Sequence, residues 1–134
     1  MDSKYKNKPL SPHLSIYRPQ ITSVMSITHR ATGFILYFAL ILIVWGLTVL
    51  TYCDHLQFEI QAFLKQNSCV INIFHTLLIF IMFATFYHLL NGLRHLYWDI
   101  GKGFTIKSVY ITGYSVIIGS IVLTAISWLY FYKL

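Results

Sequence analysis

The distribution of hydrophobic and polar positions divides the chain into a polar N-terminal segment and three long apolar runs. The runs cover residues 31–52, 69–90 and 109–131, and none contains Lys, Arg, Asp or Glu. Each reaches the length of about 20 helical residues that crosses the hydrocarbon of a bilayer, and all are too long for barrel strands. The pattern therefore predicts an all-α integral membrane protein. We expect a transmembrane domain of three helices over 31–134, and over 1–30 a surface segment with the start of the first helix.

The composition supports a membrane protein and argues against a nucleic-acid partner. Hydrophobic residues make up 57% of the 134 positions and charged residues 10%, whereas a soluble domain is about one quarter charged. The formal net charge is +6, but the only close group of basic residues is Lys4, Lys6 and Lys8. No soluble domain is predicted that would present a basic face. We therefore expect the lipid bilayer as a partner, and no nucleic acid.

Lys and Arg are distributed unevenly around the three runs. Eight of the ten precede the first run or lie between the second and third, namely Lys4, Lys6, Lys8, Arg18, Arg30, Arg94, Lys102 and Lys107. The other two, Lys65 and Lys133, lie between the first and second runs and at the C-terminus. Because basic residues accumulate on the cytoplasmic or matrix side, we expect the N-terminus there.

Three prolines exclude a regular helix over 9–20, and we expect this segment to lie along the same inner surface.

The inner end of the second run carries a polar stripe. At about 100° per residue, His88, Gly92, His95 and Asp99 share one helical face if the helix continues past residue 90. A neutral imidazole at His88 can ligate haem iron, Gly92 leaves room for a flat macrocycle, and His95 can hydrogen-bond a propionate. The alternative is that His88 and Gly92 only pack at a helix contact, as such residues do in membranes. Spacing alone leaves both interpretations open, although an ionisable side chain inside a membrane favours a function.

The start of the first helix carries a second polar group. Ser26, Arg30 and Gly33 share a face at i, i+4 and i+7, and His29 lies beside it. A hydroxyl and a guanidinium one turn apart can bind a quinone carbonyl or hold a carboxylate. The alternative is a helix-capping serine and an arginine that reaches the membrane surface. The charge distribution places this group at the same side and depth as His88, which favours one joint site.

Both polar groups lie in segments that resemble the signatures of the cytochrome b subunit of succinate dehydrogenase. The first segment extends from Arg18 to Gly33 and contains Ser-Ile-Thr-His-Arg at 26–30. The second, from His88 to Asp99, reads His-Leu-Leu-Asn-Gly-Leu-Arg-His-Leu-Tyr-Trp-Asp. The resemblance extends from residue 9 through the third run. Thr28 departs from it, because this position is commonly apolar in the family, but it touches no proposed contact.

The resemblance implies a cofactor site and a substrate site. His88 would be the axial ligand of haem b iron, and His29, Arg30 and His95 would lie near the haem propionates. Ser26, Ile27 and Arg30 would line a ubiquinone site. A second anchor subunit would supply the other axial ligand.

The resemblance also implies a role within complex II. The chain would be a non-catalytic anchor that works with an iron–sulfur subunit and a flavoprotein subunit, so that electrons from succinate reach ubiquinone. Two cysteines are too few to ligate iron–sulfur clusters, which agrees with such partners. The expected location is the mitochondrial inner membrane, or else the inner membrane of a bacterium. Two alternatives remain, the anchor of a quinol:fumarate reductase and a structural anchor without haem.

Overall fold

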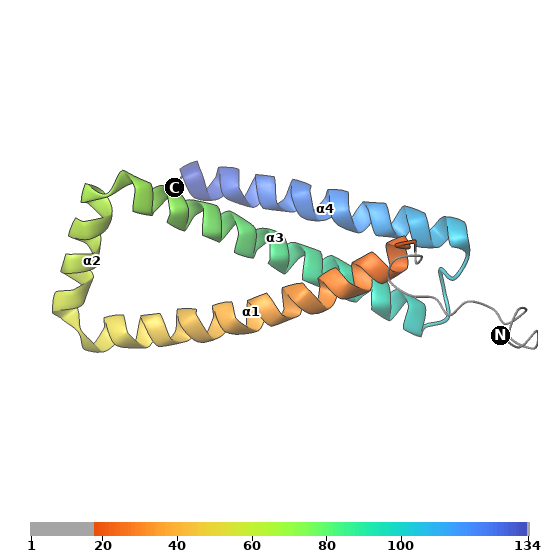
Figure 1. Cartoon of the computed structure of the whole chain (residues 1–134), viewed down its shortest axis with the longest axis horizontal. Helices are drawn as coiled ribbons and strands as arrows, with labels where there is room; N and C mark the ends of the chain where they lie inside the picture. The colour runs from red at the N-terminus through yellow and green to blue at the C-terminus, as the bar shows by residue number, and fades with distance from the viewer. Residues whose placement is uncertain (1–17, 134) are drawn as a thin grey trace, which may run out of the picture.

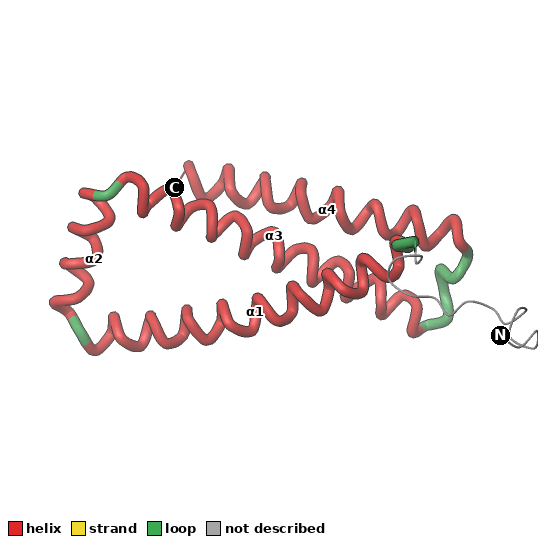
Figure 2. Tube along the Cα trace, in the orientation of Figure 1, coloured by secondary structure: helices red, strands yellow, loops and turns green. Residues whose placement is uncertain are grey.

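The computed structural model describes residues 18–133, so most of the surface segment expected over 9–20 lies outside the described part. Within that part the chain forms four helices and no strand (Figure 1). The helices are α1 (Ile21–Tyr52), α2 (Asp54–Gln66), α3 (Ser68–Asp99) and α4 (Ile106–Lys133). Figure 2 shows that only short connections separate them. Three of the four, α1, α3 and α4, are long and apolar enough to cross a membrane, as the three runs predict.

The three long helices converge at one end of the molecule. The start of α1, the end of α3 and the start of α4 lie together there, and we call this region the convergent end (Figure 1). Toward the other end α3 stays close to α4, whereas α1 diverges from both and is joined back to α3 by α2. The polar residues identified in the sequence lie at or near the convergent end.

A small core explains why the helices meet at this end. Met25 of α1, Tyr87 of α3 and Val116 of α4 are all buried and pack together. Gly113 of α4 permits the contact, because a Cβ atom there would lie 3.0 Å from the Met25 sulfur and 3.1 Å from the Ile21 Cδ1 atom. Absence of a side chain at Gly113 thus lets α1 approach α4 closely.

Two helical features go beyond the expected spans. No element was predicted for the residues between the first two runs, but most of them form α2. Leu56, Ile60 and Phe63 repeat at helical spacing there, which indicates a helix. The segment was passed over because it is too short to cross a membrane. In addition, α3 continues to Asp99, as the predicted stripe requires, and ends before Gly101, whose φ of 77° suits glycine.

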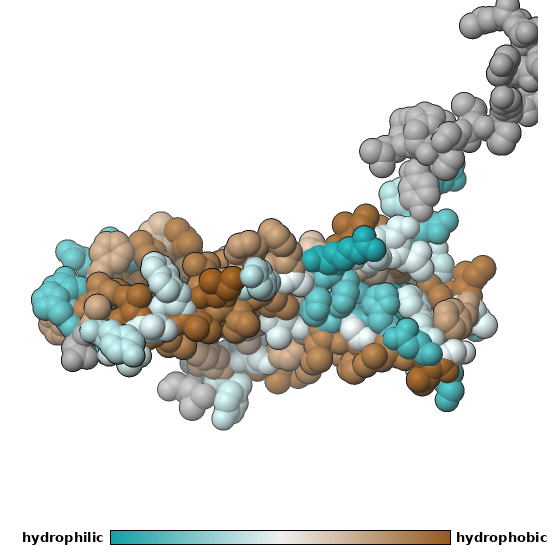
Figure 3. All heavy atoms as spheres, turned by 90° about the horizontal axis from the view of Figure 1, so that it is seen from below, coloured by the Kyte–Doolittle hydropathy of each residue, from teal (hydrophilic) through white to brown (hydrophobic). Residues whose placement is uncertain are grey.

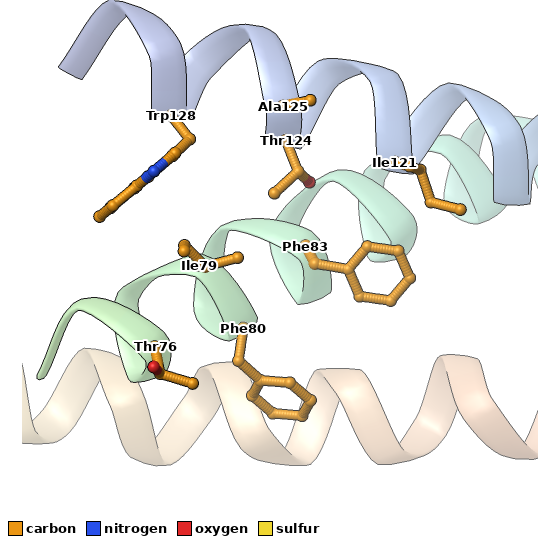
Figure 4. A pocket seen from close by; sticks show the side chains of 8 residues that line it. All are labelled: Thr76, Ile79, Phe80, Phe83, Ile121, Thr124, Ala125 and Trp128. Atoms are coloured by element: carbon orange, nitrogen blue, oxygen red, sulfur yellow. The ribbon is translucent and has the colours of Figure 1, made fainter. Parts of the chain in front are cut away.

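The surface is mostly apolar, as expected for helices that face lipid. Figure 3 shows hydrophobic atoms interrupted by hydrophilic ones at the α2 end and again toward the convergent end. A groove of about 510 Å³ between the halves of α3 and α4 away from the convergent end is lined almost entirely by apolar side chains, Phe80, Phe83 and Trp128 among them (Figure 4). The two cysteines, Cys53 and Cys69, are exposed free thiols at either end of α2.

Candidate functional site

His88 lies on α3 against the backbone of α1. A Cβ atom at Gly33 would lie 2.9 Å from the His88 Cε1 atom, so the glycine makes room for the imidazole ring. The His88 Nδ1 atom is 3.2 Å from the carbonyl oxygen of His29 and 3.2 Å from the Oγ1 atom of Thr32. The Thr32 hydroxyl itself donates to the His29 carbonyl at 2.8 Å.

These contacts select one tautomer of His88. A carbonyl oxygen can only accept, so the proton of a neutral imidazole lies on Nδ1. The lone pair then lies on Nε2, which has no hydrogen-bond partner among residues 18–133. An imidazole oriented through one nitrogen while the other is open is the usual arrangement of a metal ligand.

Two further histidines join His88 in what we call the histidine cluster. The ring of His29 stacks on that of His88, with centroids 4.0 Å apart and planes 9° apart. The His95 ring lies 5.5 Å from that of His29. The Nδ1 atom of His29 is buried and has no partner in the described part of the chain. The sequence placed His88 and His95 on one stripe, and the structure adds His29 from the facing helix.

The histidine cluster suits a group that needs only one metal ligand from this chain. No three His, Cys, Asp or Glu side chains in the described residues are arranged to hold a metal ion together. A haem would need only one iron ligand from this chain, which the His88 Nε2 atom could provide. Gly92 is also nearly unobstructed, since a Cβ atom there would meet only His29, at 4.0 Å. The residues present therefore fit a haem.

The residues predicted to bind quinone, Ser26, Ile27 and Arg30, lie close together near the start of α1. Ser26 is half-buried, while Ile27 and Arg30 are exposed, Ile27 to 65%. Neither Ser26 nor Arg30 makes a side-chain hydrogen bond or an ion pair within the described range, and nothing there joins them to His88. Their donors can therefore bind a group from outside the chain. Asp99, the last member of the predicted stripe, is exposed and takes no part in the histidine cluster.

A buried polar contact between α1 and α3 was missed by the sequence analysis. The carbonyl oxygen of Met25 accepts from Thr28 at 3.1 Å and, from across the interface, from Tyr87 and Asn91 at 3.4 Å each. Thr28 and Tyr87 also share a hydrogen bond through their hydroxyl groups. Thr28, which was expected to touch no proposed contact, thus links the two helices one residue before His29. The available signal was the position of Asn91 directly after the apolar run 69–90, since an amide that is buried there needs a partner, and the structure buries it fully.

Arg94 was also missed, because it was counted among the residues outside the membrane helices. In the structure it belongs to α3, is 5% exposed and faces α4. Its Nε atom donates to Thr112 Oγ1 at 3.1 Å and its Nη2 atom to the Val109 carbonyl at 3.1 Å. Its guanidinium lies 4.1 Å from the centre of the Trp98 ring. Arg94 therefore connects the end of α3 to the start of α4.

Comparison with known proteins shows the family to which the chain belongs. Residues 4–127 match the family model described as succinate dehydrogenase/fumarate reductase transmembrane subunit. The chain is 48% identical over 125 residues to the succinate dehydrogenase cytochrome b556 subunit of Rickettsia felis, covering 92% of this chain and 93% of the relative. It is 40% identical over 127 residues to the succinate dehydrogenase cytochrome b560 subunit of Reclinomonas americana, covering 93% and 87%. The mitochondrial cytochrome b560 subunit of Bos taurus is 38% identical over 112 residues, covering 84% and 64%.

These matches and the three membrane-length helices support the predicted location, a multi-pass position in an inner membrane. They extend over nearly the whole chain and include both segments that carry the polar groups. The chain belongs to the family of succinate dehydrogenase and fumarate reductase transmembrane subunits, and its relatives are cytochrome b subunits of succinate dehydrogenase.

Proposed function

We propose that this chain is the membrane-anchoring cytochrome b subunit of a succinate:ubiquinone oxidoreductase. It holds one haem b together with a second anchor subunit and forms part of the site where ubiquinone is reduced. The observation that carries the proposal is the environment of His88, whose Nδ1 atom is held by the His29 carbonyl while Nε2 stays open. The chain itself is non-catalytic, and succinate oxidation takes place on a flavoprotein subunit and an iron–sulfur subunit.

In this proposal His88 would ligate the haem iron. His29, Arg30 and His95 hold the propionates, since cationic or N–H-bearing side chains pair well with carboxylates. The buried, unpartnered Nδ1 atom of His29 supports this assignment, because a buried polar atom normally has a partner. A bound haem supplies a one-electron carrier inside the membrane. The second anchor subunit provides the other axial ligand.

Ser26, Ile27 and Arg30 form this chain's part of the ubiquinone site. The Ser26 hydroxyl donates a hydrogen bond to a quinone carbonyl, and the Arg30 guanidinium offers a planar, forked set of donors beside it. The exposed side chain of Ile27 provides an apolar contact for the ring. The position of all three at the convergent end, near the histidine cluster, supports a joint site. That end faces the matrix or the bacterial cytoplasm, where the iron–sulfur subunit docks.

Purification of the complex that contains this chain tests the proposal as a whole. We expect four different subunits by mass spectrometry and a reduced-minus-oxidised spectrum of a low-spin b-type haem. We also expect succinate-dependent reduction of a ubiquinone analogue. A complex that reduces the analogue but contains no haem would show a structural anchor instead. A complex that only oxidises quinol with fumarate would show the reverse reaction.

A further inference from the structure

Arg94 is a buried cation with no carboxylate partner in the described part of the chain. Its three nitrogen atoms donate to neutral acceptors: the Thr112 hydroxyl, the Val109 carbonyl and, at 3.5 Å, the Asn91 side-chain oxygen. A guanidinium carries five N–H groups, so two remain without an acceptor. Contact with the Trp98 ring offsets part of the cost of burying the charge. A buried charge is stabilised fully only when an opposite charge is nearby.

A cavity of about 250 Å³ opens beside Arg94 between α3 and α4. Arg94, Tyr97, Thr112 and Ser115 are its polar lining residues, and Leu90, Leu93 and Val116 are its apolar ones. Leu93 is 53% exposed, so the cavity opens on the surface of the helix pair. The cavity thus combines a charged side chain with an apolar lining.

Arg94 is the side chain of the cavity that favours an anion as its occupant. Thr112 donates to the Ser108 carbonyl at 2.8 Å, and Ser115 donates to the Thr112 carbonyl at 2.9 Å. Their hydrogens are therefore committed within α4, and the spare N–H groups of Arg94 are the strongest donors left. A guanidinium binds phosphate oxygens particularly well.

The position of the cavity along and around α3 separates it from the histidine cluster. Arg94 is six residues from His88, which at about 100° per residue places them roughly 120° apart around the helix. His88 faces α1, whereas Arg94 faces α4. Arg94 also lies one turn from Trp98, near the end of the membrane-length helix, where lipid phosphates and aromatic side chains are found.

We propose that this cavity binds the phosphate group of a membrane phospholipid. The two spare N–H groups of Arg94 donate to phosphate oxygens, and an acyl chain lies along Leu90, Leu93 and Val116. Inorganic phosphate would satisfy the charge but leave the apolar groove uncovered. The proposal depends on neither the haem nor the quinone assignment.

Three variants of the purified complex that contains this chain test the proposal. Arg94→Met removes the charge while keeping a long side chain, and Ser115→Leu fills the cavity but leaves Arg94 in place. Ala125→Leu is the matched control, because it enlarges a side chain of α4 in the other groove between α3 and α4. The readouts are native mass spectrometry after detergent washing, and binding of labelled phosphatidylglycerol.

We expect the parent and Ala125→Leu to retain a phospholipid that Arg94→Met and Ser115→Leu lose. Loss of a charged hydrogen bond should weaken phosphatidylglycerol binding at least about tenfold. Equal retention in the parent and Ser115→Leu would overturn the proposal, and that comparison decides the matter even if Arg94→Met does not assemble. Equally tight binding of diacylglycerol would exclude a phosphate site. Displacement of the lipid by inorganic phosphate at matched concentration would assign a free anion instead.

Discussion

One tautomer and one glycine determine what His88 can do. The carbonyl of His29 and the hydroxyl of Thr32 fix the imidazole through Nδ1, and Gly33 provides the space that the ring occupies. None of these three groups needs to touch a haem to affect its binding, because they orient the ligand rather than supply one.

Substitution of Gly33 should therefore impair haem binding. In Gly33→Ala the new Cβ atom would lie 2.9 Å from His88 Cε1, so the ring must move. Overpacking of this kind costs about 1–3 kcal/mol, which corresponds to roughly five- to hundredfold weaker haem retention. Gly46→Ala is the control, since a Cβ atom there meets nothing within 4 Å. Equal haem-to-protein ratios in the two variants would show that the contact is unimportant.

Ser26 and Arg30 should affect quinone reduction more than assembly. Loss of a hydrogen bond to the quinone costs about 1–3 kcal/mol, so Ser26→Ala should slow reduction of a ubiquinone analogue by about five- to a hundredfold. Arg30→Lys should also be damaging, because lysine keeps the charge but loses the forked donors.

The control for these two variants is reduction of a water-soluble dye by the partner subunits, which should persist at the parent rate. Activities are compared in membranes that contain equal amounts of assembled complex. If both variants reduce quinone within about twofold of the parent, a change too small for a lost hydrogen bond, the residues serve only as helix anchors.

At the scale of helices, the sequence predicted spans and faces but not contacts between them. The three spans follow from a requirement that any membrane helix must meet, and the His88–His95 stripe follows from the helical period. The stacking of His29 on His88 depends on how α1 crosses α3, which no periodicity within one helix contains. The hydrogen bonds of Arg94 to α4 could not be predicted either. They depend on α3 continuing beyond residue 90 and on the proximity of α4.

The contact between α1 and α3 should depend on Asn91. This side chain is fully buried, and its amide donates to the Met25 carbonyl. Asn91→Leu removes that hydrogen bond and leaves the Arg94 Nη1 atom without its acceptor, which should cost about 1–3 kcal/mol and lower the midpoint of thermal inactivation. Asn72→Leu, an exposed position on the same helix, is the control. Indistinguishable midpoints would mean that the polar contact adds nothing to stability.

At the scale of the whole molecule, the two ends differ in charge and should face different compartments. Lys65 lies in the last turn of α2, and Lys102 and Lys107 lie at the convergent end, where α3 leads into α4. All three are exposed. A membrane-impermeant amine reagent should label Lys102 and Lys107 only from the matrix or cytoplasmic side, and Lys65 only from the other side. Reversed labelling would place the histidine cluster at the wrong surface for partners that oxidise succinate.

The most direct test of the haem assignment is the reduced-minus-oxidised spectrum of the complex with His88→Ala. His75→Ala is the matched control, because His75 lies on the same helix but contacts Trp128, away from the histidine cluster. If the His88 variant does not assemble, His88→Met substitutes another iron ligand and should shift the haem spectrum. We expect the low-spin b-type spectrum to be lost or greatly weakened in His88→Ala and unchanged in His75→Ala. An unchanged spectrum in an assembled His88→Ala complex would show that His88 does not ligate the haem iron.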